Sequence, residues 1–297
     1  MIDPVAQRAL DLRARPTWRT AKNTIMSAVM VSGFVLIAIP LVAVLWSVIS
    51  RGAHTAFGQF PDFFTKPIPN ISRLPGPGMG PAIVGTLLVT AGATLLAVPL
   101  GILGAVYLHE YGQESKFTRL VRFMAVVMTG VPSIVMGLFV YVMWTMRYGY
   151  SAFGGSIAMA LLMLPVVIGA TEQMLRLVPA NLREASYALG ASKSRTILTV
   201  ALPAALPGIV SGSLLAVARA AGETAPLLFT IGAATRLNPH LLDGANNALS
   251  AQIFVNATSS FAGAQDRAWA AALTLVLLTF SITMVARVFT ARFAMKR

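Results

Sequence analysis

Long apolar stretches separated by short polar ones run along most of the 297-residue chain. A helix that crosses a bilayer needs about 20 mostly apolar residues. The pattern predicts six transmembrane helices, near residues 24–49, 82–108, 122–146, 154–175, 204–232 and 267–289. We therefore expect an all-α integral membrane protein. Its single six-helix domain would cover residues 24–292, between an N-terminal segment of residues 1–23 and a tail of residues 293–297.

Composition and charge support a lipid environment. Only 11% of the residues are charged, whereas a soluble domain has about 25%. The net charge of +13 would also fit a nucleic-acid partner. Most basic residues, however, lie near the termini and in the loops after the second and fourth spans, which six spans place on one side. Basic residues gather in cytoplasmic loops, so this distribution predicts cytoplasmic termini and requires no nucleic acid.

Several kinds of chemistry are not expected. The chain has no cysteine and three scattered histidines, so we expect no disulfide and no metal site. It has no G-x-x-x-x-G-K-[ST] motif to bind nucleotide phosphates and no nucleophile–base pair. We therefore expect no catalysis and no cofactor.

Of the two long outer loops, residues 51–81 are predicted to be non-helical. The other, residues 233–266, is predicted to hold a short amphipathic helix in "NALSAQIFVNATSSF".

The cytoplasmic loop of residues 176–203 contains "NLREASYALGASKSRTILTVALP". A first helix would end at Gly190, because glycine is a common C-terminal cap. A second short helix would end before Pro203. This helix–turn–helix at the membrane surface has a shape suited to another protein's cleft, although the spacing alone favours an ordinary connecting loop.

The loop resembles the EAA loop of ABC importer permeases, in which E-A-A is followed by G and then by I-x-L-P. The matching residues are Glu184, Ala185, Gly190, Leu202 and Pro203, while Ser186 replaces the second alanine and Val200 the isoleucine. The resemblance implies that Leu182 to Gly190 form a coupling helix in a groove of a cytoplasmic ATPase. ATP and magnesium would bind to that partner chain.

Arg219 and Glu223 lie within the fifth apolar segment. Four residues apart on a helix, they share one face and can pair. Charged side chains at membrane depth are costly and mark transport pathways by default. Glu223 would restrain Arg219, so that an anion is held only transiently; a purely structural ion pair is the alternative. On the same helix, small residues recur every four positions and predict close helix packing: Ala204, Gly208, Gly212, Ala216 and Ala220.

The segments "RAAGETAPLLFTIGA", "GTLLVTAGATLLAVPLGILGAVYLHEY" and "GVPSIVMGLFVY" resemble the phosphate-uptake permeases of the PstA type. The resemblance implies a bacterial cytoplasmic-membrane importer of phosphate. Its partners would be a PstC-type permease subunit, a PstB-type ATPase dimer and an extracytoplasmic phosphate-binding protein. Pro132 would break the third span, which makes Thr129 and Ser133 candidates to line the path or merely part of a kink.

Other interpretations remain open. The chain could be the PstC-type subunit, or an ABC permease for sulfate, molybdate or phosphonate. An ion-coupled secondary transporter would need titratable groups on several spans, whereas only the fifth clearly carries them. A structural membrane subunit would explain neither the docking loop nor the ion pair.

Overall fold

The computed structural model describes residues 18–69, 78–112 and 115–294, with side chains as far as residue 288. All regular structure in these residues is helical. The chain divides into two compact units, Met1–Ile49 and Ser50–Arg297. Residues 1–17 of the predicted N-terminal segment (1–23) and residues 295–297 of the predicted tail (293–297) lie outside the described residues. The assignment of residues 24–292 to one domain stays a prediction.

The first unit contains most of helix α2 (Trp18–Gly58). Apolar side chains occur on every side of residues 18–49; Phe34, Leu36 and Ile37, for example, are each 73% exposed. A helix that is apolar all round requires lipid or other helices as its surroundings. The first predicted span, residues 24–49, is therefore confirmed as a helix of the right length and polarity.

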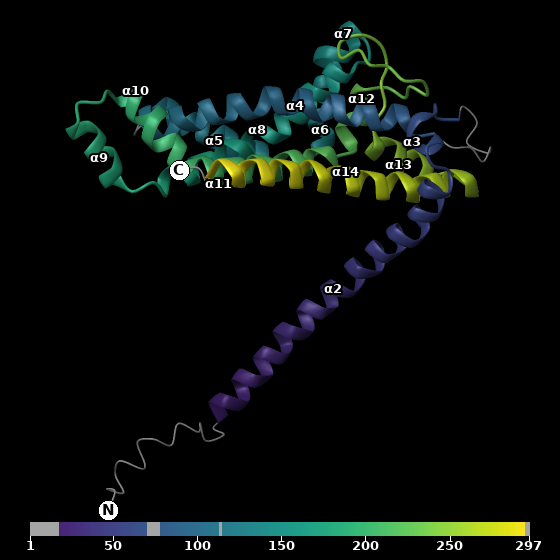
Figure 1. Cartoon of the computed structure of the whole chain (residues 1–297), viewed down its shortest axis with the longest axis horizontal. Coiled ribbons are helices and arrows are strands. Elements are labelled where there is room, and N and C mark those ends of the chain that lie inside the picture. Colours follow the sequence, from purple (N-terminus) through teal and green to yellow (C-terminus); the bar gives the residue numbers. More distant parts are fainter. Residues whose placement is uncertain (1–17, 70–77, 113–114, 295–297) are drawn as a thin grey trace, which may run out of the picture. The chain divides into compact units, whose positions relative to one another are not determined.

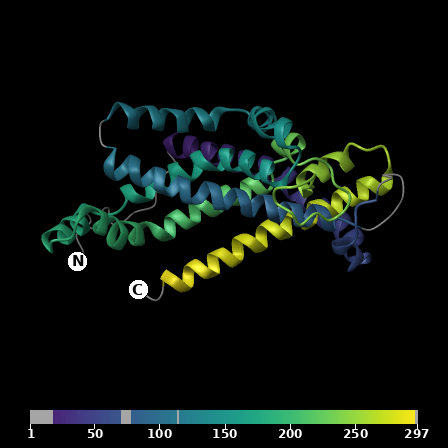
Figure 2. The same ribbon diagram turned by 90° about the horizontal axis from the view of Figure 1, so that it is seen from above.

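The second unit is a bundle of long helices with short ones at its two ends. Figures 1 and 2 both show α9 and α10 at one end and α12 and α13 at the other. Its helices, in chain order, are the last residues of α2, then α3 (Asp62–Thr65), α4 (Gly80–Val106) with the π-helical turn η1 (Tyr107–Tyr111), α5 (Lys116–Gly130), α6 (Ser133–Val140) with the π-helical turn η2 (Tyr141–Thr145), α7 (Met146–Tyr148), α8 (Ala152–Arg176), α9 (Ala180–Ala188), α10 (Lys193–Thr196) with the π-helical turn η3 (Ile197–Ala201), α11 (Leu202–Ala221), α12 (Ala225–Thr230), α13 (Leu249–Ala257) and α14 (Ala262–Ala294).

The core of this unit forms where α4 and α11 pack against α8. Along α4, small or β-branched residues recur every four positions and are all buried: Gly85, Val89, Ala93, Ala97, Gly101 and Ala105. A Cβ added to Gly101 would lie 2.6 Å from Val167 of α8. On α11, a Cβ added to Gly212 would lie 2.4 Å from the Ala170 side chain. Small residues let membrane helices approach closely enough for their backbones to pack.

The second, fourth and sixth predicted spans are confirmed as α4, α8 and α14. The third is not one straight helix, because α5 and α6–α7 meet at a bend of 107°. Val131 and Pro132 have extended backbone there, which is the conformation that a proline favours in the residue before it. Among the described residues, five helices are long and apolar enough to cross a membrane, or six if this bent pair is one span.

The fifth predicted span, residues 204–232, ends too late. Helix α11 stops at Ala221 with Gly222 as its C-cap, and α12 is a separate helix with Pro226 near its start. The predicted stop before Pro203 is also wrong. Residues 193–221 run on as one candidate span of 29 residues, because the wider turn η3 just before Pro203 accommodates a residue that lacks an N–H group.

The outer loops follow the sequence prediction only in part. Residues 51–58 continue α2 and residues 62–65 form α3, so the loop prediction for residues 51–81 is wrong in its first half. Residues 70–77 lie outside the described part. The amphipathic helix predicted in the second outer loop is confirmed as α13.

We expect Gly212→Ala to destabilise the bundle relative to Gly169→Ala. The added methyl group at residue 212 meets Ala170, whereas nothing lies within 4 Å of a Cβ at residue 169. Overpacking typically costs about 1–3 kcal/mol. Both variants gain the same helix propensity, so their difference in unfolding free energy isolates the packing cost. Thermal unfolding in detergent measures it, and equal stabilities would contradict close packing of α8 on α11.

Candidate functional site

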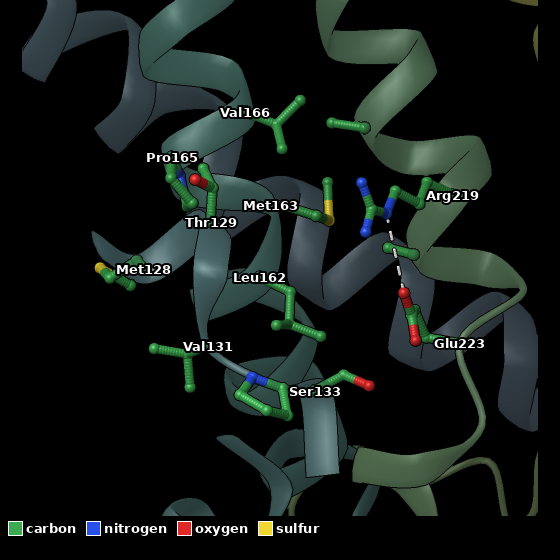
Figure 3. Close-up of a pocket in the computed structure, with 13 residues that line it drawn as sticks. Met128, Thr129, Val131, Ser133, Leu162, Met163, Pro165, Val166, Arg219 and Glu223 are labelled. Atoms are coloured by element: carbon green, nitrogen blue, oxygen red, sulfur yellow. Dashed lines mark ion pairs between the residues drawn. The ribbon is translucent and has the colours of Figure 1, made fainter. Parts of the chain in front are cut away.

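A cavity of about 280 Å³ lies where the break between α5 and α6 faces the middle of α8 and the end of α11. It is lined by residues Met128, Thr129, Val131, Pro132, Ser133, Leu162, Met163, Pro165, Val166, Ala216, Arg219, Ala220 and Glu223. All four residues that the sequence proposed for a substrate path are among them (Figure 3). Apolar side chains from α8 form much of the remaining wall, and the sequence analysis did not single these out.

Arg219 and Glu223 form a loose ion pair in this cavity. The Arg219 Nε atom lies 3.7 Å from Glu223 Oε1, too far for a hydrogen bond. The Arg219 side chain is 73% exposed and that of Glu223 is 24% exposed, so the arginine is open to the cavity and the carboxylate is partly shielded. Arg219 lies in the last turn of α11, and Glu223 follows the Gly222 C-cap of that helix. Since an exposed pair binds weakly, the guanidinium N–H groups remain available to an anion.

Thr129 and Ser133 stand on either side of the helix break. The Thr129 hydroxyl donates to the carbonyl of Val126 at 2.6 Å, so its proton is already engaged. Ser133 is the first residue of α6, where the N–H groups of the opening turn have no partner within the helix. Of these two residues, Ser133 is the better placed to donate to an anion.

The second group of predicted residues lies in the cytoplasmic loop. Glu184 and Ala185 are exposed on α9, and Gly190 is exposed with φ +80° just after it. That left-handed backbone is one that glycine adopts without strain, which confirms the predicted helix end. Leu189, one residue earlier, is 89% exposed. Leu182 and Tyr187 of α9 are exposed as well, and several exposed apolar side chains on one short hairpin are typical of an interaction surface.

Leu202 and Pro203 do not belong to that exposed surface. They are half-buried at the start of α11, where Leu202 packs against the apolar cluster that contains Leu175 and Val178. The structure therefore separates the five residues that match the EAA motif into two groups. Glu184, Ala185 and Gly190 are exposed on the loop, whereas Leu202 and Pro203 join the loop to the bundle.

A cluster of charges between the loop and the bundle was missed from sequence. Glu110 in η1 and Glu172 near the end of α8 are 8% and 7% exposed. Arg183 of α9 donates to Glu110, and Arg122 of α5 donates to Glu172. Glu172 also corrects the expectation that only the fifth span clearly carries titratable groups. Its position within a predicted span was a usable signal, because buried acidic groups need partners.

No three His, Cys, Asp or Glu side chains gather in a metal-binding group among the residues that the structure describes. The cavity itself contains one acidic and one basic side chain. Its chemistry is therefore that of an exposed guanidinium, a serine hydroxyl and a helix start, all of which favour an anion.

The chain is similar in sequence to known membrane transport proteins. Residues 97–295 match the family model described as "Binding-protein-dependent transport system inner membrane component". The chain is 42% identical over 297 residues to phosphate transport system permease protein PstA 1 of Mycobacterium tuberculosis, strain CDC 1551 / Oshkosh; the match covers 96% of this chain and 92% of the relative. It is 40% identical to PstA of Yersinia pestis, with 94% of each chain covered.

A solved structure shares the fold. The inward-facing methionine ABC transporter MetNI matches 71% of this chain and 92% of its own, with a TM-score of 0.56 and 20% sequence identity. At that identity the similarity concerns the fold alone. It confirms the predicted architecture of an all-helical ABC importer permease.

Proposed function

The chain belongs to the family of binding-protein-dependent transport system inner membrane components, and on that basis we propose that it is the PstA-type permease subunit of an ATP-driven phosphate importer. The similarity of about 40% to named PstA proteins over nearly the whole chain carries the proposal. An anion-compatible cavity beside the break of α5 and α6 supports it.

Arg219 is the residue that contacts the phosphate. Its guanidinium is exposed to the cavity and held only loosely by Glu223. Arginine donates two parallel hydrogen bonds to a phosphate group, and the Ser133 hydroxyl and the start of α6 lie in the same cavity. Glu223 limits how strongly the anion is held, since release is as necessary to transport as binding.

The Glu223 carboxylate also favours phosphate over sulfate. An ionised carboxylate only accepts hydrogen bonds. Phosphate at neutral pH keeps at least one O–H group to donate, whereas sulfate has none and is repelled. A carboxylate beside the anion-binding arginine therefore fits a protonated oxyanion.

The exposed hairpin of α9 and its following turn is the ATPase-docking surface, with Glu184, Ala185 and Gly190 on it. The chain binds no nucleotide itself and needs no cofactor, because ATP and magnesium belong to a PstB-type ATPase dimer. A PstC-type permease subunit completes the pathway, and an extracytoplasmic phosphate-binding protein delivers the substrate.

The protein lies in the bacterial cytoplasmic membrane with both termini on the cytoplasmic side, where its basic loops are concentrated.

Reconstitution tests this function directly. The chain, expressed with its partner permease, ATPase and binding protein, is placed in liposomes, and uptake of radiolabelled phosphate, sulfate and molybdate is compared. We expect ATP-dependent uptake of phosphate alone. Equal or preferred uptake of another oxyanion would refute the phosphate assignment and leave the permease assignment intact.

Arg219→Gln should lower phosphate uptake by about 10- to 100-fold. A hydrogen bond to a charged group contributes about 1.5–3 kcal/mol, and every 1.4 kcal/mol is tenfold. The matched control is Arg119→Gln, an equal change of charge at an exposed position on α5. Both variants should co-purify with their partners. Normal uptake by Arg219→Gln would remove this residue from the pathway.

Glu223→Gln should have a smaller effect, at most about 5-fold, because an exposed ion pair contributes only about 0.2–1 kcal/mol. The unrestrained arginine holds the anion longer, so turnover falls while the half-saturation concentration also falls. Steady-state uptake measures both, with Glu223→Asp as the charge-preserving control. A rise in the half-saturation concentration would show that Glu223 assists binding instead of limiting it.

A further inference from the structure

One arginine connects the docking helix to two long helices of the bundle. Arg183 lies on α9, and its Nη2 atom donates to Glu110 Oε1 at 3.0 Å and to the Leu175 carbonyl at 2.9 Å. Its Nη1 atom donates to the Val178 carbonyl at 3.4 Å. We call these groups the Arg183 junction. They join α9 to the end of α4 and to the end of α8.

The α4 side of this junction is well shielded from water. Glu110 is 8% exposed and sits in the π-helical turn η1 that continues α4. His109, its neighbour, places Nε2 3.3 Å from the same Arg183 nitrogen. An ion pair in such a setting interacts strongly, and separating the charges would leave a buried carboxylate without its partner.

The α8 side uses the end of that helix. Leu175 is in the last turn of α8, where carbonyl groups lack helical partners and a positive charge is favoured. One turn earlier, Glu172 Oε1 accepts from Arg176 and from Arg122 of α5, each at 2.7 Å. The end of α8 is thereby joined to α9 through Arg183 and to α5 through Glu172. Both α5 and α8 supply residues to the Arg219 cavity.

A different contact joins α9 to the helix that carries Arg219. The hydroxyls of Ser186 on α9 and Thr196 on α10 are 2.8 Å apart. This neutral hydrogen bond is weaker than a charged one. Compared with this hydroxyl pair, the Arg183 junction is therefore the stronger link between α9 and the bundle.

We propose that Arg183 is the positioning residue that makes α9, α4 and α8 move together when the ATPase acts on the loop. The proposal deepens the proposed function and rests on it, since it takes α9 as the docking helix. Arg183 does not touch the substrate. Its planar guanidinium contacts a carboxylate and two carbonyls at once, an arrangement that the single ammonium of a lysine reproduces poorly.

The junction predicts that, in a complex with the Arg183→Gln chain, the partner ATPase hydrolyses ATP without a matching movement of the cavity walls. In the reconstituted complex, ATP hydrolysed per phosphate transported should rise about 5-fold or more, the lower end of usual coupling between sites. Arg119→Gln, with the same loss of charge at an exposed position on α5, should keep the parent ratio. An unchanged ratio in Arg183→Gln overturns the proposal.

A second readout follows the cavity itself. The chain has no cysteine, so Ser133→Cys supplies a single thiol in this chain. Its rate of labelling by a maleimide is measured in the resting complex and after vanadate trapping. The two labelling rates should differ in the complex that carries Ser133→Cys alone. They should become equal when Arg183→Gln is added to the same chain. A retained difference overturns the role of Arg183, as does the lack of any difference in the parent.

If the Arg183→Gln chain does not assemble with its partners, Glu110→Gln is the substitute variant. It removes the negative charge of Glu110 and keeps an oxygen that can accept a hydrogen bond from Arg183. It should uncouple in the same direction, and the double variant should resemble either single one. Additive effects of the two changes overturn a shared role. Failure of the parent complex to take up phosphate, with labelling still responsive to vanadate, refutes the proposed substrate and leaves the Arg183 junction standing.

Discussion

Close backbone packing of α4 and α11 against α8 is the constraint on which the rest of the second unit depends. Lipid gives helices no hydrophobic reason to associate, so van der Waals contact must hold them together. Gly101 and Gly212 permit it by bringing α4 against Val167 and α11 against Ala170 of α8, with no room for a Cβ. With α8 fixed in this way, its middle forms one wall of the cavity and its end forms one side of the Arg183 junction.

The two charged sites differ in a manner that suits different tasks. Glu110 is buried and receives a hydrogen bond from Arg183 at 3.0 Å, whereas Arg219 is exposed and 3.7 Å from Glu223. Desolvation makes separation of the first pair costly. The second pair is longer and more exposed, so its exchange for an anion costs less. The tight pair thus lies where helices are joined, and the loose one lies where the proposed function requires an anion to bind and leave.

Sequence alone predicted most of the fold, because apolar length is a strong signal in membrane proteins. It failed where a helix is interrupted inside an apolar run. The stop after Ala221 is set by Gly222 and Pro226, and the run "APLLFT" hid it. Thr129, Ser133, Arg219 and Glu223 were each named from sequence and line one cavity. The Glu110–Arg183 pair joins residues 73 positions apart, and the α8 wall faces residues of α5, α6 and α11. No local sequence pattern indicates such contacts.

The continuous span that carries Arg219 is a second connection between the loop and the cavity, besides the Arg183 junction. Residues 193–221 form one candidate span of 29 residues, about 40 Å long at 1.5 Å per residue. The loop of α9 and α10, proposed above to dock the ATPase, lies at its start, and Arg219 lies in its last turn. A displacement of α10 can therefore reach Arg219 along a continuous helix, while the Arg183 junction carries the same displacement to α8 and the opposite wall. Because both walls of the cavity are connected to one loop, a movement of that loop can change their separation, which a connection to either wall alone would not ensure.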